Sequence, residues 1–137
     1  MPRCILKSAF ISFLLLPAGS ACSSDTITNC VCTQEFRTFA VTVVDEAGQP
    51  VSDAMLTRLN LRSGQVLEPT WLGLLQPGVY LVADDGNLDA FSSEGDLVRV
   101  TGTNGTINFS ADFEFASPAP CRCHVEQLAG PDTVVMR

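Results

Sequence analysis

Several residue types that carry enzyme chemistry are nearly missing from this chain of 137 residues. It has one histidine, His124, and one lysine, Lys7. No serine lies in the strand-turn-helix context of a nucleophile elbow, and no glycine-rich phosphate loop is present. With one imidazole and no recognisable nucleophile beside it, the sequence favours a non-catalytic protein.

Positive charge is also scarce, with eight Lys and Arg residues against fifteen Asp and Glu residues, a net charge of −7. Removal of residues 1–21, which include Arg3 and Lys7, would leave six positive and fifteen negative residues, a net charge of −9. A surface of this sign repels nucleic acid and anionic membrane faces. Nucleic acid is therefore excluded as a partner.

The chain lacks an apolar run long enough to span a bilayer, but residues 1–21 have the pattern of an export signal. Arg3 and Lys7 precede an apolar stretch over residues 9–16, and small residues follow it at positions 17–21. The apolar stretch is too short for a transmembrane helix. We expect this segment to be removed, so it takes no part in the fold.

The residues around Cys22 carry a resemblance. Ala18-Gly19-Ser20-Ala21-Cys22 resembles the processing site of bacterial lipoproteins, which implies a lipid on the Cys22 thiol and an acylated new amino terminus. Ser23 and Ser24 follow without an aspartate, which implies sorting to the outer membrane, with the protein facing the periplasm or the cell surface. Residues 22–29 would then form a polar, lipidated tether. The alternative is ordinary cleavage, which gives a soluble periplasmic or secreted protein.

Cysteine is absent between two short clusters, Cys30-Val-Cys32 and Cys121-Arg-Cys123. An even number of cysteines in an exported chain predicts disulfides. If the clusters lie on adjacent antiparallel strands, residues i and i+2 share a face, which pairs Cys30 with Cys123 and Cys32 with Cys121. The other pairing, Cys30 with Cys121 and Cys32 with Cys123, stays open.

The alternative for these clusters is a metal site, because four thiols and the neighbouring His124 could bind zinc or copper. The usual zinc spacing is C-x₂₋₄-C, whereas these clusters have C-x-C, and an oxidising compartment favours disulfides. His124 is expected to be a packed or surface side chain. No cofactor is predicted.

One acidic loop could hold a cation: Asp84, Asp85, Asn87 and Asp89 surround a glycine, and closely spaced oxygens of this kind can bind Ca²⁺. Their spacing differs from that of an EF-hand loop, and Asp-Asp-Gly-Asn is ordinary turn chemistry, so the turn is favoured. A small hydrolase built on this loop is a further alternative.

The remaining sequence predicts strands, because apolar residues alternate with polar ones and no window has a helical period. One inward face holds Phe39, Val41 and Val43. The Asn104-Gly105 pair predicts a hairpin, and residues 79–83, apolar on both faces, predict a central strand. Trp71 and Leu72 are expected to cover an open edge. A second inward face holds Ile107, Phe109, Ala111, Phe113 and Phe115, and strands are expected over residues 35–45, 54–61, 79–83, 97–103, 106–116, 121–128 and 133–136.

Several short strands separated by turn signals indicate an all-β fold, a single immunoglobulin-like or transthyretin-like antiparallel sandwich of about seven strands over residues 30–137. Residues 41–54, with the pattern D-x-x-G-x-P-V-x-x-A, and Pro77-Gly-Val-Tyr80 resemble carboxypeptidase regulatory-like domains. That resemblance implies a non-catalytic, transthyretin-like module of a bacterial surface protein. It leaves a protein or glycan ligand at the cell envelope unidentified.

Overall fold

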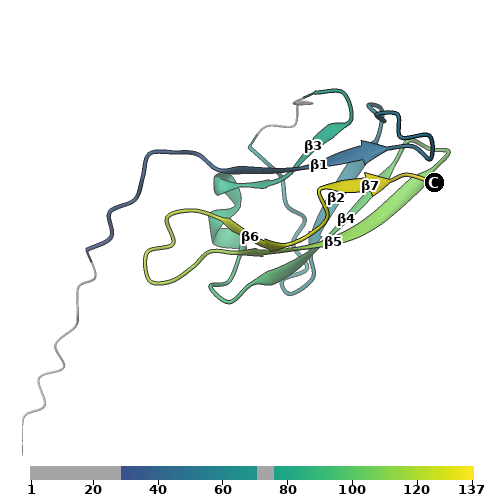
Figure 1. Ribbon diagram of the computed structural model, residues 1–137. Helices are drawn as coiled ribbons and strands as arrows, with labels where there is room; N and C mark the ends of the chain where they lie inside the picture. Colours follow the sequence, from purple (N-terminus) through teal and green to yellow (C-terminus); the bar gives the residue numbers. More distant parts are fainter. Residues whose placement is uncertain (1–28, 71–75) are drawn as a thin grey trace, which may run out of the picture.

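A computed structural model describes residues 29–70 and 76–137 of the chain (Figure 1). The predicted export signal, Cys22, the tether as far as residue 28, and Trp71 and Leu72 lie outside the described residues. Within them no helix is long and apolar enough to cross a membrane.

The described residues form two packed β-sheets, as the strand pattern predicts (Figure 1). One sheet has the order β3-β1-β7 and consists of β1 (Thr38–Val44), β3 (Val79–Asp84) and β7 (Thr133–Val135). The other has the order β2-β4-β5-β6 and consists of β2 (Met55–Asn60), β4 (Asp96–Thr103), β5 (Asn108–Ala116) and β6 (Glu126–Ala129). The all-β sandwich of about seven strands is confirmed. Among the described strand pairs β1 and β7 alone run parallel.

The core lies between the sheets and is filled by the predicted inward faces. Val41 and Val43 of β1 are buried, as are Phe109, Phe113 and Phe115 of β5. The partly buried members of those faces, Phe39, Ile107 and Ala111, pack against the same cluster. Alternation with period two therefore identified both buried faces, because successive side chains of a strand point to opposite sides.

The expectation that residues 79–83 form a central strand is wrong. β3 is buried on both faces, but it is the edge strand of its sheet. The buried Arg58 side chain of β2 lies across this edge, and its Nε donates a hydrogen bond of 2.8 Å to the Leu81 carbonyl. Burial of both faces therefore does not require a neighbouring strand on each side.

The predicted hairpin is present, with residues Asn104 to Ile107 connecting β4 to β5. The Asn104 Oδ1 atom accepts hydrogen bonds from the backbone N–H groups of Thr106 and Ile107. Gly105 adopts a φ of 90°, which glycine tolerates because it has no Cβ. The described helical structure is one 3₁₀ helix, η1 (Asp85–Ala90), in line with the expected turn or two.

The predicted strand over residues 121–128 is shorter in the structure, where β6 begins at Glu126. Residues 121–123 belong to a turn in which Arg122 has a left-handed φ of 42° and donates its backbone N–H to the Pro118 carbonyl at 2.9 Å. After β6 the chain crosses to the other sheet at Gly130, where a Cβ atom would lie 2.4 Å from Phe113 Cδ1. Glycine lets the backbone pass over this buried ring.

One carboxylate, that of Asp96 at the start of β4, is completely buried. It accepts hydrogen bonds from Arg62 Nη2 at 2.8 Å, Asn60 Nδ2 at 3.0 Å and the Ser92 hydroxyl at 2.8 Å. The bond from Arg62, together with those from Asn60 and Ser92, holds the pKa of Asp96 below its ordinary value, although burial acts in the opposite direction. Asp96 therefore stays ionised and ties the loop before β4 to the residues around the end of β2.

Candidate functional site

The cysteine clusters form two disulfides, but the pairing favoured by the strand argument is wrong. Cys30 bonds to Cys121 with a Cα–Cα distance of 5.3 Å, and Cys32 bonds to Cys123 with a Cα–Cα distance of 5.4 Å. The pairing that stayed open is therefore the observed one. The antiparallel argument failed because residues 121–123 lie in a turn rather than in a strand beside the first cluster.

The first cluster belongs to an exposed segment, residues 29–36, which we call the N-terminal arm. Every residue of the arm is exposed and none belongs to a sheet. In Figure 1 the arm projects from the end of the sandwich that holds η1. It leads towards Cys22, so any force on the chain before residue 29 would reach the sandwich through the arm.

A histidine and a carboxylate lie next to the disulfides. His124 Nδ1 is 2.7 Å from Asp85 Oδ2, and His124 Nε2 is 2.8 Å from the Thr33 hydroxyl of the arm. Asp85 also accepts the backbone N–H of Arg37 at 2.9 Å and that of Val125 at 2.8 Å. Burial alone would raise the pKa of Asp85, but these hydrogen bonds and His124 lower it below its ordinary value. Asp85 therefore links the residue before β1 to the segment before β6 through one carboxylate.

The order Thr33–His124–Asp85 has the connectivity of a nucleophile, base and orienting acid. The pocket at this end, of about 180 Å³, is lined by Arg37, residues 118–124 and Glu126. The hydrogen bonds of the three side chains join the arm to the body of the protein.

Sequence reasoning missed this hydrogen-bonded set because its members are 39 and 91 positions apart in the chain. Local spacing carries no signal for such a contact. The placement of Asp85 follows from η1: the Asp84 side chain and Asn87 form a capping box at the helix start, which fixes the first helical residue.

Three of the four side chains of the acidic loop that could have held calcium, those of Asp84, Asp85 and Asn87, are hydrogen-bonded within the protein. Asp84 accepts hydrogen bonds from the backbone N–H groups of Gly86 and Thr70 at 2.8 and 2.7 Å. The Asn87 amide donates to the Glu68 carbonyl, and Asp89 points to solvent. Over the described ranges no three His, Cys, Asp or Glu side chains are grouped to hold a metal ion.

The zinc or copper alternative needs thiolates, since these are the forms of cysteine that bind such metals. All four sulfurs, those of Cys30, Cys32, Cys121 and Cys123, are joined in disulfides, and the His124 nitrogens contact Asp85 and Thr33. Metal binding by these residues would first require reduction of both bridges.

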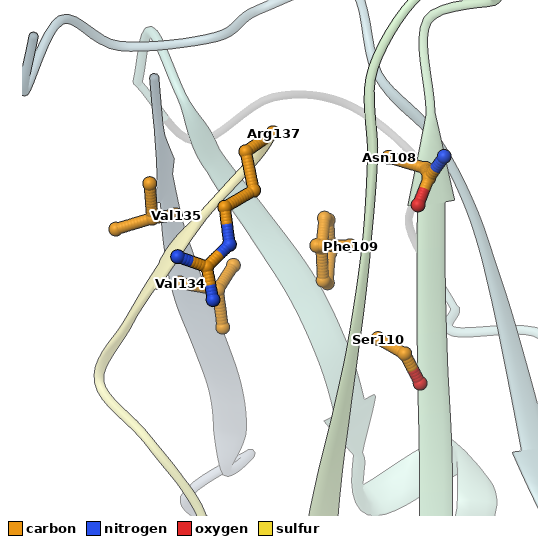
Figure 2. Close-up of a pocket in the computed structure, with 6 residues that line it drawn as sticks. All are labelled: Asn108, Phe109, Ser110, Val134, Val135 and Arg137. Atoms are coloured by element: carbon orange, nitrogen blue, oxygen red, sulfur yellow. The ribbon is translucent and has the colours of Figure 1, made fainter. Parts of the chain in front are cut away.

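A groove lies between β5 and β7 (Figure 2). The backbones of Asn108 and Arg137 exchange two hydrogen bonds at one end of it, and the strands then separate around a space of about 480 Å³. Figure 2 shows the Phe109 ring between β7 and the side chains of Asn108 and Ser110. Val134, Val135 and the largely buried Phe109 line the groove together with Asn108, Ser110 and Arg137. An apolar surface with a few polar groups suits a contact with a peptide or a glycan.

No protein-family model, no curated protein and no solved structure matches the chain. The resemblances to lipoprotein signals and to carboxypeptidase regulatory-like domains therefore remain predictions from the sequence.

Proposed function

We propose that the protein is a non-catalytic lipoprotein of a bacterial outer membrane, anchored through Cys22, whose sandwich is a binding or structural module. The observation that carries this proposal is the pair of disulfides between the arm and the turn at residues 121–123. Disulfides of this kind persist outside the reducing cytoplasm. They also join the body covalently to the segment that follows the proposed lipid anchor.

The groove between β5 and β7 supports the proposal of a binding module, because its lining combines the polar side chains of Asn108, Ser110 and Arg137 with exposed Val135. A protein or glycan ligand at the cell envelope would contact such a groove.

The anchor is tested by growing cells that express the protein with a clickable fatty acid. Wild-type protein should carry the label and fractionate with the outer membrane, and the Cys22→Ser variant should lose both properties. An unlabelled wild-type protein in the soluble periplasmic fraction would reject the lipoprotein proposal and favour the soluble alternative.

Thiol titration in denaturant separates the proposal from the zinc or copper alternative. The oxidised protein should show no reactive thiol among the four cysteines of the clusters before reduction and four after it. Four reactive thiols together with bound zinc or copper in the purified protein would reject the disulfide-linked module.

A further inference from the structure

The contacts of the N-terminal arm with the rest of the protein are few. Among the described residues, the arm is joined to the body by the two disulfides, by the hydrogen bond between Thr33 and His124, and by the ion pair of exposed Glu35 with the neighbouring Arg37. None of its side chains is buried, and Val31 between the two cysteines is 93% exposed. Because the arm buries so little surface, its position depends on the sulfur bonds.

The body is held separately from the arm, starting at Arg37. The Arg37 backbone N–H donates to the Asp85 carboxylate at 2.9 Å, and its carbonyl accepts the Asp85 N–H at 3.1 Å. β1 begins at the next residue and pairs with β3 and β7. The buried apolar core contains no cysteine. Cutting the disulfides therefore removes no core contact and no sheet hydrogen bond.

We propose that the two disulfides form a redox-controlled clasp, whose reduction frees the arm and lengthens the membrane tether while the sandwich stays folded. The inference rests on the proposed anchor at Cys22. Cys30 and Cys32 are exposed, so a dithiol reductase of the thioredoxin type can reach their bridges, and exposed disulfides are the kind that serve as regulatory bonds.

The chemistry is ordinary thiol–disulfide exchange with a protein dithiol. One reductant thiolate attacks a sulfur of the bridge and forms a mixed disulfide, and the other sulfur leaves as a thiolate and takes up a proton. The second reductant thiol then attacks the mixed disulfide and releases the second cysteine. Each bridge thus consumes two electrons and two protons, and the reductant ends as a disulfide.

The two bridges allow four redox states, and opening the Cys32–Cys123 bridge alone leaves the tether attached at Cys30. The other three states differ in the number of residues between lipid and body. With both bridges intact the tether runs from Cys22 to residue 29, eight residues, and spans at most about 28 Å. With the Cys30–Cys121 bridge open it gains two residues and spans at most about 35 Å. With both bridges open it runs to residue 36, fifteen residues, and spans at most about 52 Å.

Two variants with one bridge each provide a matched comparison, because both lose one disulfide and only one of them lengthens the tether. Cys30→Ser/Cys121→Ser moves the point of attachment to Cys32. Cys32→Ser/Cys123→Ser leaves it at Cys30. A difference in reach between these variants cannot come from the loss of a disulfide as such.

The experiment uses the full lipidated protein in phosphatidylcholine nanodiscs, with a fluorophore on a ketone-bearing residue at exposed Thr101 and an acceptor on the lipid headgroups. Relative to the oxidised wild type, the largest donor–headgroup distance should increase by about 7 Å in Cys30→Ser/Cys121→Ser and by about 24 Å after dithiothreitol. Cys32→Ser/Cys123→Ser should show no increase.

Nuclear magnetic resonance of the same samples reports on the arm and on the body. After reduction the ¹⁵N heteronuclear NOE of residues 30–36 should fall, while amides of β1 and β5 stay protected from exchange. An unchanged NOE in the arm, loss of protection in β1, or equal reach in the two matched variants would overturn the clasp. Missing lipid with a released arm would instead reject the anchor alone.

Discussion

The two disulfides should stabilise the fold in a strongly non-additive way. Each joins residues 91 positions apart, so either one closes nearly the whole described chain into a loop. In the chain-entropy model such a loop stabilises the folded state by about 4.5 kcal/mol. Once one bridge is present, the other closes a loop of only a few residues, which contributes about 2 kcal/mol.

Removal of one bridge, as in Cys30→Ser/Cys121→Ser or in Cys32→Ser/Cys123→Ser, should therefore lower the free energy of unfolding by about 2 kcal/mol. Removal of both should lower it by about 6 kcal/mol, well beyond the sum of the two single losses. The dependence of the unfolding free energy on denaturant should also steepen, because the unbridged unfolded chain exposes more surface.

Guanidinium unfolding followed by far-ultraviolet circular dichroism measures all four proteins. Two single losses that add up to the loss in the fully unbridged variant would refute the argument, since it depends on both bridges closing the same loop. An unbridged variant that is unfolded without denaturant would in addition exclude release of the arm from an intact sandwich.

The remaining predictions concern three substitutions, at Asp96, Gly130 and Gly48. Asp96→Asn should lower the free energy of unfolding by about 2–3 kcal/mol, because the buried carboxylate that accepts hydrogen bonds from Arg62, Asn60 and Ser92 loses its charge. Thermal denaturation measures this loss. The folded-state pKa of Asp96 lies below its ordinary 3.8, so the stabilisation from its charge is complete above pH 3.8 and is lost on acidification. In urea unfolding from pH 7 to pH 2, the free energy of unfolding should therefore fall less for Asp96→Asn than for the wild type. Gly130→Ala should cost about 2–3 kcal/mol through strain and the Phe113 contact. Gly48→Ala, with a φ of 76° and open space around it, should cost about 1 kcal/mol, and equal losses at the two glycines would contradict the packing argument.

The strands and their buried faces could be predicted because they depend on local alternation. Phe113 and Phe115 point inward in the structure as the pattern requires. The position of residues 79–83 at the edge of their sheet could not be predicted from the same rule. Burial of both faces does not report how many strands pair with a segment, and here Arg58 of β2 lies over the free edge of β3.

The cysteine pairing and the contacts of His124 depended on backbone geometry that sequence patterns do not report. The turn at Arg122, with its left-handed φ, takes Cys121 and Cys123 out of a strand and aligns them with the arm in the opposite sense to the expected one. The prediction that these four cysteines form two disulfides is nevertheless confirmed, because it depends on their even number and on an oxidising compartment rather than on backbone geometry.

The two sheets are connected differently at the two lateral edges of the sandwich. On one side the backbone itself runs from β6 in one layer to β7 in the other within three residues, so the layers cannot part there without stretching covalent bonds. On the opposite side β2 meets β3 through the guanidinium of Arg58 on the Leu81 carbonyl. Spontaneous opening of the core to solvent should therefore begin at the edge beside Arg58, and the edge at Gly130 should open last.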